Sequence, residues 1–255
     1  TVQAYVAGGK RDSLNFTRTL QYEQVPGVIG SGFRTFPNET CLYDMKGNFH
    51  PEQGTLSLWI RPDNWKIREA ASVFFSAEIP GIYKMLLYTY LEKPYLNLDV
   101  SLPDKNVNRR IAGKVNMDTA RWTRVDIIWD RSRIKMYIDG LLAGEDVLPE
   151  GTILPEATDN GKISINPNGY FGKDDRYTKL TTVDEVMIYS VVLPEQVFQK
   201  SYSAVMEMRA GKYRNPVVTI PKTRTSPIID GILDSEEWKD ASVIQARHMG
   251  GRARF

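Results

Sequence analysis

Three segments of this chain alternate apolar and polar residues with a period of two, and this pattern constrains the fold most. They are Gly54–Pro62, Ala120–Trp129 and Arg133–Gly140. The third segment ends in the dipeptide Asp139-Gly140, which favours a tight hairpin turn. Half-buried strands joined by tight turns predict an all-β fold, a two-sheet antiparallel jelly-roll sandwich.

Shorter apolar runs of the same kind occur before, between and after these three segments along the sequence. Predicted strands lie at Ser13–Tyr22, Phe33–Phe36, Thr40–Tyr43, Val73–Phe75, Lys84–Tyr90, Tyr95–Val100, Lys162–Ile165 and Val183–Tyr189. About a dozen short strands separated by turn residues are typical of two packed sheets.

One helix is predicted, at 194–210, and we expect it to lie against the edge of the sandwich. Pro194 stands near its first position, Glu195 lies in its first turn, and Gly211 suits its C-terminal cap. The apolar residues from Val197 to Met208 recur at helical spacing and indicate a packing face. After Gly211 the prolines predict an extended linker and tail.

The composition is that of an ordinary soluble domain and excludes several classes of function. Lys and Arg number 33 against 31 Asp and Glu, which leaves no electrostatic footprint for nucleic acid. The single cysteine, Cys41, excludes an internal disulfide, and we expect it to be a buried apolar residue. No apolar run reaches membrane-spanning length. Thr1 is not a start methionine, so a removed signal peptide is compatible with the sequence.

Five phrases, taken in order along residues 1–210, resemble bacterial laminin G-like domains of the concanavalin A-like lectin/glucanase superfamily. They are Gly30-Ser-Gly-Phe-Arg-Thr-Phe36, Gly54-Thr-Leu-Ser-Leu-Trp-Ile-Arg-Pro62, Trp122-Thr-Arg-Val-Asp-Ile-Ile-Trp129, Ile134-Lys-Met-Tyr-Ile-Asp-Gly140, and Val183-Asp-Glu-Val-Met-Ile-Tyr189 followed by Leu193-Pro-Glu195. The resemblance implies an antiparallel jelly roll and an extracellular binding function.

A second, shorter resemblance concerns the tail. Ile229-Asp-Gly-Ile-Leu-Asp-Ser-Glu-Glu-Trp238 is similar to the opening of family 9-like carbohydrate-binding modules. We therefore expect a jelly roll at 1–210, a linker at 211–227 and the first part of such a module at 228–255. The pair implies a larger secreted or cell-surface bacterial protein that processes polysaccharide.

Catalytic signatures of related folds are missing from the sequence. Family 16 glycoside hydrolases carry Glu-x-Asp-x-x-Glu on one strand, and no Glu-x-Asp occurs in this chain. Lyases of the alginate type use a His with a Tyr, but no recognisable motif surrounds His50 or His248. The sequence thus favours a module that is not an enzyme by itself.

Asp184 is the candidate metal ligand. In the superfamily an Asp that opens the last strand binds structural Ca²⁺ together with carbonyls of an early turn, and calcium favours such oxygen ligands. The Asp-Gly that usually follows the early Phe-rich strand is replaced here by Pro37-Asn38. The alternative is a strand residue held by a hydrogen bond or an ion pair.

Aromatic residues supply the candidate ligand-binding positions. Trp129 shares a face with core residues, Trp59 is expected to be covered, and Trp65 follows Asp63-Asn64 in a loop where exposure is expected. The loop 166–177 combines aromatic, acidic and basic residues that suit sugar recognition. Its candidate residues, with Trp65, are Tyr170, Asp174, Asp175, Arg176 and Tyr177.

Three functions remain open from the sequence. The first is a non-catalytic module that binds a polysaccharide or other glycan. The second is a structural or adhesive module that packs against other domains or another chain. The third is a hydrolase or lyase with an unrecognised site. The fold alone does not choose among them, because it supports many functions.

Overall fold

The computed structural model describes residues 4–5, 11–12, 22–119 and 121–211. The chain divides into two compact units, Thr1–Met206 and Glu207–Phe255, and the first holds all the strands of the described residues. The predicted fragment at 228–255, with Trp238 and His248, lies outside the described residues, as does the linker beyond Gly211. Most of the predicted strand at Ser13–Tyr22 lies outside them too.

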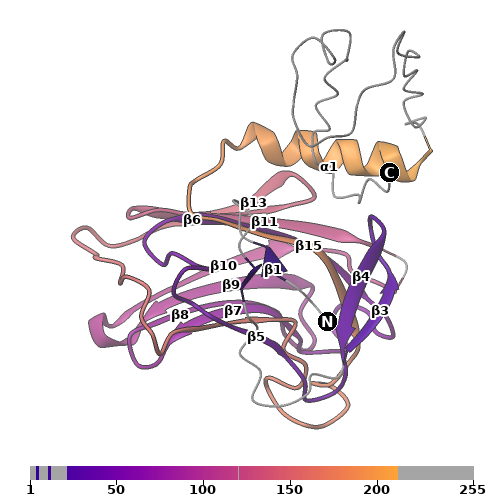
Figure 1. The fold of residues 1–255 in the computed structure, drawn as a ribbon, viewed down its shortest axis with the longest axis horizontal. Coiled ribbons are helices and arrows are strands. Elements are labelled where there is room, and N and C mark those ends of the chain that lie inside the picture. Colours follow the sequence, from indigo (N-terminus) through magenta and orange to yellow (C-terminus); the bar gives the residue numbers. More distant parts are fainter. Residues whose placement is uncertain (1–3, 6–10, 13–21, 120, 212–255) are drawn as a thin grey trace, which may run out of the picture. The chain divides into compact units, whose positions relative to one another are not determined.

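One layer of the first unit is a seven-stranded antiparallel sheet (Figure 1). Its order is β13-β12-β11-β6-β15-β4-β3. The strands are β3 (Tyr22–Pro26), β4 (Ser31–Thr35), β6 (Gly54–Pro62), β11 (Thr123–Trp129), β12 (Arg133–Ile138), β13 (Leu141–Val147) and β15 (Thr181–Tyr189). Asp139 and Gly140 both have positive φ, at 53° and 80°, and they turn β12 into β13 as predicted.

The second layer is a six-stranded antiparallel sheet of order β10-β9-β8-β7-β14-β5. Its strands are β5 (Cys41–Asp44), β7 (Val73–Ile79), β8 (Tyr83–Thr89), β9 (Tyr95–Leu102), β10 (Val107–Lys114) and β14 (Lys162–Ile165). A two-residue pair, β1 (Ala4–Tyr5) with β2 (Arg11–Asp12), and a 3-10 turn, η1 (Pro103–Lys105), complete the strand region. The prediction of a two-sheet antiparallel sandwich is confirmed.

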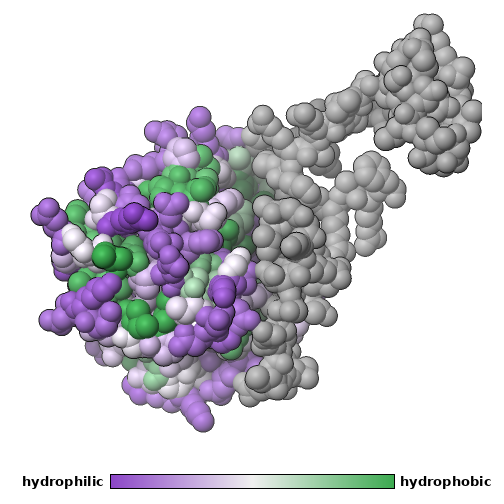
Figure 2. Space-filling view, turned by 60° about the vertical axis from the view of Figure 1, so that its left-hand side comes forward, coloured by the Kyte–Doolittle hydropathy of each residue, from purple (hydrophilic) through white to green (hydrophobic). Residues whose placement is uncertain are grey.

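The core lies between the two sheets because each strand turns its apolar set inward. Leu56, Leu58 and Ile60 of β6 are fully buried there. The Trp129 ring stacks on Phe49 at 4.9 Å, so the prediction that Trp129 is a core residue is confirmed. On the surface, hydrophobic side chains form separated patches among hydrophilic ones (Figure 2).

Helix α1 (Gln196–Arg209) covers the outer face of the seven-stranded sheet, so the prediction that it lies against the edge is wrong. Tyr202 stacks on Trp59 at 5.7 Å, and Phe198 packs on Tyr137 at 4.9 Å. The helix packs on this face because Trp59 and Tyr137 project from β6 and β12 on the side away from the core. The predicted cover over Trp59 is therefore supplied by α1.

Apart from the two-residue strands β1 and β2, the strands that were not predicted from the sequence are β3, β10 and β13. All three are edge strands, and β10 and β13 keep many side chains in solvent, so their apolar alternation is weak. The β10 and β13 edges lie against each other, since Arg109 Nε donates a hydrogen bond to the Val147 carbonyl at 3.1 Å. One side of the sandwich is closed by this contact.

Candidate functional site

The outer face of the six-stranded sheet carries both polar and aromatic side chains. In β8, Tyr83, Met85 and Leu87 point into the core, so Lys84 and Tyr88 point outward. The neighbouring strands follow the same alternation, and their outward residues pair in rows across the sheet. The face is thus a regular surface whose chemistry is set by these rows.

One row alternates charge across four neighbouring strands. Asp44 of β5 pairs in register with Lys162, which pairs with Glu78, which pairs with Lys84. The Lys162 ammonium forms an ion pair with the Asp44 carboxylate. Opposite charges directly across strands stabilise the sheet, so this row compensates its own charge.

A second polar group lies toward the β10 edge. The Arg110 guanidinium binds the Asp99 carboxylate with two bonds of 2.7 Å, and the Tyr88 hydroxyl donates to Asp99 at 3.2 Å. Burial, and then the Asp99 charge, raise the pKa of Tyr88 to about 12, so its hydroxyl stays a proton donor at neutral pH. Both carboxylate oxygens of Asp99 therefore accept hydrogen bonds from these two side chains.

The loop 166–177 folds against this outer face, and its base is held at Asn166. The Asn166 N–H donates to the Phe74 carbonyl at 2.9 Å, and its side-chain amide donates to the Thr181 carbonyl at 2.8 Å. Asn166 has a φ of 50°, which Asn tolerates better than most residues. Farther on, the Ala71 N–H donates to the Arg176 carbonyl at 3.0 Å. The loop is therefore anchored at both ends.

Four aromatic rings meet where the loop contacts β8, and we call Tyr88, Tyr90, Tyr170 and Phe171 the aromatic shelf. Phe171 is central, with ring centroids of Tyr170, Tyr88 and Tyr90 at 5.4, 5.6 and 6.1 Å. All three contacts are edge-to-face, which is the favoured geometry. Tyr90 is 50% exposed and Tyr170 is 37% exposed, so the shelf presents two rings to solvent.

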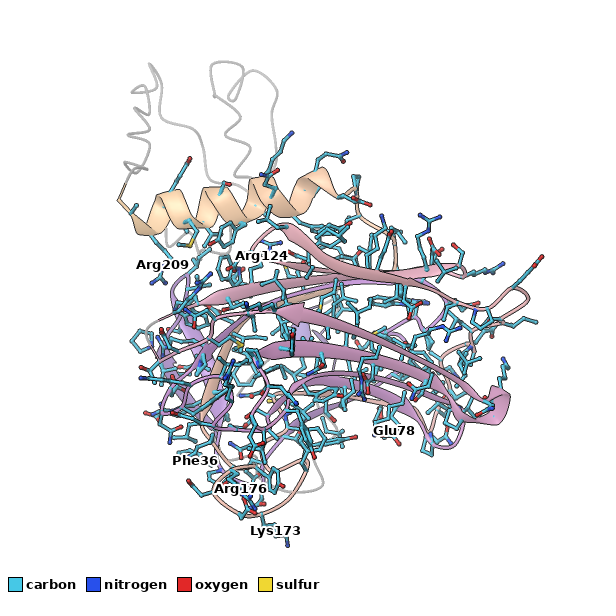
Figure 3. The ribbon with its side chains drawn as sticks, turned by 180° about the vertical axis from the view of Figure 1, so that it is seen from behind. Phe36, Glu78, Arg124, Lys173, Arg176 and Arg209 are labelled. Atoms are coloured by element: carbon cyan, nitrogen blue, oxygen red, sulfur yellow. The ribbon has the colours of Figure 1, made fainter. Side chains whose placement is uncertain are left out.

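Lys84 joins the aromatic shelf to the charged row. Its ammonium lies 5.2 Å from the centroid of the Tyr170 ring, within the range of a cation–π contact. This contact fixes Tyr170 above β8, on the outer side of the sheet. Figure 3 places Glu78 on that outer side as well, with Lys173 and Arg176 in the loop beyond it.

The predicted ligand-binding residues of the loop lie together at its exposed end. Asp174 binds the Arg176 guanidinium at 3.0 Å, and Asp175 pairs with Lys179. The Arg176 guanidinium carbon lies 5.5 Å from the centroid of the Tyr177 ring. The structure therefore brings Tyr170 and the residues from Asp174 to Tyr177 into one loop.

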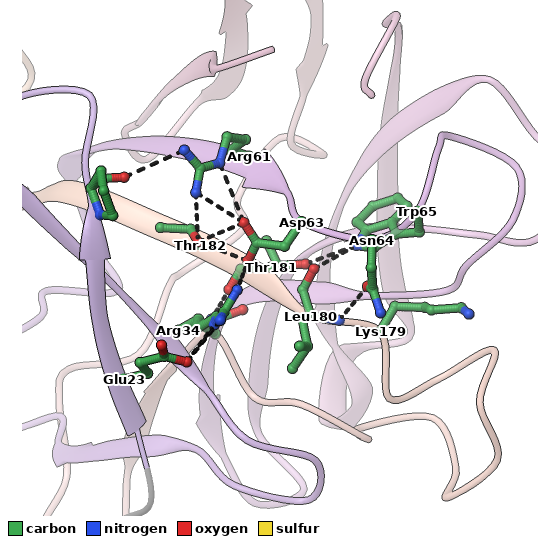
Figure 4. A network of polar contacts seen from close by, with 12 residues as sticks. Glu23, Arg34, Arg61, Asp63, Asn64, Trp65, Lys179, Leu180, Thr181 and Thr182 are labelled. Atoms are coloured by element: carbon green, nitrogen blue, oxygen red, sulfur yellow. Dashed lines mark hydrogen bonds and ion pairs between the residues drawn. The ribbon is translucent and has the colours of Figure 1, made fainter. Parts of the chain in front are cut away.

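Trp65 lies elsewhere, and the expectation that it is exposed is wrong. It is 1% exposed, its ring stacks with Phe74, and its Nε1 donates to the Leu180 carbonyl at 3.0 Å (Figure 4). Asn64, its neighbour, accepts a hydrogen bond from the Leu180 N–H. Trp65 thus supports the segment that follows the loop and offers no face to a ligand.

Beside Trp65, Asp63 holds several segments together in the network of Figure 4. Its carboxylate pairs with Arg61 at 3.0 Å and with Arg34 at 3.5 Å, and it accepts hydrogen bonds from the Thr182 hydroxyl. Arg34 also pairs with Glu23 of β3. The network joins β3, β4, β6 and β15, so its role is to hold these strands together.

Asp184 has a similar structural role in the β3–β4 hairpin. Its Oδ2 accepts the N–H groups of Val28 at 2.8 Å and Ile29 at 3.2 Å, and its Oδ1 accepts the Glu185 N–H at 2.8 Å. Burial raises the pKa of Asp184, and these amide donors oppose that rise. A Cβ on Gly27 would lie 2.3 Å from Oδ2, so only glycine admits this approach.

The sequence of this chain matches a known protein superfamily. The sequence model of the concanavalin A-like lectin/glucanases superfamily matches residues 38–197, which is more than half of the chain. The chain belongs to this superfamily. The match does not reach 228–255, so the family 9-like module there stays a prediction. No curated protein matches the chain.

Solved structures of the superfamily fold include toxin binding domains. The binding domain of Paraclostridial Mosquitocidal Protein 1 has a TM-score of 0.55 and 14% identity over 79% of this chain and 51% of its own. The receptor binding domain of botulinum neurotoxin C/D mosaic serotype has a TM-score of 0.54 and 11% identity over 72% and 46%. The chain spans about half the length of these domains, and identities this low show the fold alone.

The calcium site implied for the superfamily does not fit Asp184. Both carboxylate oxygens accept backbone N–H groups, whose positive ends would oppose a cation. The early turn beside it is Gly27–Gly30 rather than Pro37-Asn38. Within residues 4–5, 11–12, 22–119 and 121–211, no three His, Cys, Asp or Glu side chains group as metal ligands. The hydrogen-bonded alternative matches the geometry, and a chelation experiment tests whether calcium binds at Asp184.

Four residues on the outer face of the six-stranded sheet were not identified from the sequence. They are Tyr90, Phe171, Lys84 and Asp99. Tyr90 lies just after β8, and Phe171 lies in a loop about 80 residues later. The outward alternation of Lys84, Leu86 and Tyr88 was a usable signal. The alternation does not indicate that the loop 166–177 lies against this strand.

Proposed function

We propose that this chain is a non-catalytic module that binds a glycan at the aromatic shelf. The observation that carries the proposal is the pair of exposed tyrosine rings, Tyr90 and Tyr170, which both contact Phe171. Aromatic faces suit the apolar faces of sugar rings, while nearby hydroxyl, amide and charged groups suit sugar hydroxyls. Membership of a lectin and glucanase superfamily agrees with a binding role.

The shelf is built for binding at a fixed position. Its loop is anchored at Asn166 and Arg176, and its rings are held by Phe171 and Lys84. Preorganised rings lose little conformational entropy when a ligand arrives. Asp174, Asp175, Arg176 and Tyr177, at the exposed end of the loop, are proposed as secondary polar contacts.

The test is binding of the purified chain to a panel of soluble polysaccharides, including laminarin, galactomannan, hydroxyethyl cellulose, dextran, alginate and heparin. For the polysaccharide that binds best, we expect Tyr90→Ala with Tyr170→Ala to weaken affinity at least about tenfold, or 1.4 kcal/mol. Leu142→Ala, an exposed position on β13 of the other sheet, is the matched control and should retain affinity.

Two further measurements complete this test. The melting temperature of the double variant should stay close to that of the wild type, because both side chains are partly exposed and lie outside the core. Unchanged glycan affinity in the double variant would show that the aromatic shelf is not the glycan-binding site. Asp174→Ala with Arg176→Ala should have a smaller effect than the tyrosine pair.

The setting of the module is part of the same proposal. The similar structures are the binding domain of a mosquitocidal protein and the receptor binding domain of a botulinum neurotoxin. In the described residues no helix is long and apolar enough to cross a membrane. We place this chain in a larger secreted or cell-surface bacterial protein, and detection of the native protein in culture medium or on intact cells tests that placement.

A second candidate function, an interaction module, rests on a separate observation. The edge strand β13 exposes Leu141, Leu142 and Val147 at 65%, 51% and 62%. Exposed apolar edges pair with other chains unless they are protected. If this function holds, light scattering will show a dimer that Leu142→Lys dissociates, and glycan affinity will not change.

A further inference from the structure

We infer that the aromatic shelf holds at least two consecutive uncharged sugar units, rather than a single sugar. The inference rests on the proposed function and specifies its ligand. It follows from the separation of the two exposed rings and from the way the charges around them are compensated.

The first step is geometric. Tyr90 and Tyr170 each meet Phe171 edge-on, at interplanar angles of 84° and 86°. Among the described residues, no ring contact joins these two tyrosines directly, and each meets Phe171 through its own contact. One tyrosine follows β8 and the other comes from the loop 166–177. The shelf therefore offers two stacking positions, and a ligand must be longer than one sugar ring to occupy both.

The second step concerns charge. Near the shelf, Asp99 is bound by Arg110, Asp44 pairs with Lys162, and Glu78 lies in register between Lys162 and Lys84. In the loop, Asp174 pairs with Arg176 and Asp175 with Lys179. A charged sugar would have to compete with these pairs, whereas an uncharged sugar leaves them intact.

The third step is the position of Lys84. Its ammonium faces the Tyr170 ring at 5.2 Å, while Glu78 lies directly across in β7. Glu78 is the register partner of Lys84, so the charge of Lys84 is balanced within the row. Its role in the shelf is to position Tyr170, and a hydroxyl remains a suitable partner for its remaining N–H donors.

The experiment measures affinity by calorimetry for cello-, laminari- and manno-oligosaccharides of one to six units. In the series that binds, affinity should rise at least tenfold between one unit and three or four, and then level off. Tyr90→Ala and Tyr170→Ala, tested separately, should each weaken the longest oligosaccharide about tenfold. Each should also remove most of the length dependence, because one stacking position remains. Leu142→Ala should reproduce the wild-type series.

Salt dependence tests the charge argument. Between 50 and 500 mM NaCl, affinity for the bound oligosaccharide should change less than twofold, because no ion pair forms with an uncharged ligand. A monosaccharide that binds as tightly as the hexasaccharide would overturn the inference while leaving the proposed function in place. Preferential, salt-sensitive binding of alginate or heparin would do the same. Binding of none of these sugars would contradict the proposed function itself.

Discussion

Asp184 and Gly27 illustrate how a single contact fixes a turn in this protein. The carboxylate accepts three backbone N–H groups, and the missing Cβ of Gly27 leaves room for it. Asp184→Ala leaves these donors without their acceptor, and we expect a loss of about 1–3 kcal/mol in the free energy of unfolding. Denaturant unfolding measures it, and a loss under about 0.5 kcal/mol would contradict the assigned role.

The same contact predicts the response to chelation. Because both Asp184 oxygens already bind amides, we expect EGTA to leave the melting temperature of the wild type unchanged. A ligand that binds only the folded state would raise it. A lower melting temperature in EGTA, restored by calcium and absent in Asp184→Ala, would establish the calcium site that the superfamily implies.

Gly27→Ala tests the steric side of the contact. The added methyl would lie 2.3 Å from Asp184 Oδ2 and 2.6 Å from the Gly32 nitrogen, so we expect a cost of about 1–3 kcal/mol. Gly30, in the same turn, has a φ of 63° and open space around a Cβ. Gly30→Asn is therefore the control and should cost much less, since Asn tolerates positive φ. Equal costs would contradict the steric explanation.

Cys41 gives a testable response to pH. Burial raises the pKa of its thiol from 9.0 to about 12. The stabilisation from burying the neutral thiol is complete below pH 9 and is lost as pH rises toward 12. At pH 8 we expect Ellman's reagent to react with the folded protein at least roughly 100-fold more slowly than with the protein in guanidinium. Fast reaction of the folded protein would show that the thiol is accessible.

At the scale of elements, helix α1 depends on one buried ring. Phe198 is fully buried against Tyr137 and Ile128, whereas its neighbour Val197 is 36% exposed. Phe198→Ala should cost about 3–5 kcal/mol of unfolding free energy, and Val197→Ala should cost under about 0.5 kcal/mol. Similar costs at the two positions would mean that the helix does not pack as described. Chemical denaturation of the two variants makes the comparison.

The elements also show what the sequence could predict. Period-two alternation located β6, β11 and β12, and capping residues located α1 within two residues at each end. The placement of α1 was wrong because amphipathic spacing identifies an apolar face but not its partner surface. Trp65 was misplaced for a related reason. Its Nε1 donates to a carbonyl 115 residues away, which local sequence does not reveal.

For the molecule as a whole, the two layers and their common core were predictable, and the site was predictable only in part. Tyr170 and the rest of the loop were identified by composition, but the shelf also needs Tyr90, which comes from a distant strand. Sandwich topology brings such residues together by long-range pairing, as β14 pairs with β7 far earlier in the chain. The sequence alone therefore contains both parts of the site, Tyr90 and the loop 166–177, but does not show that they are in contact.

The placement of α1 has a practical consequence for orienting the protein on a sensor. The helix covers one outer face of the sandwich, and the aromatic shelf lies on the other (Figure 3). Ser203 is exposed on α1, and Cys41, the single cysteine of the sequence, is buried. A maleimide attached at Ser203→Cys would therefore immobilise every molecule in one orientation. Both sheets, about 10 Å apart, would separate the support from the two tyrosine rings, which would face the solution.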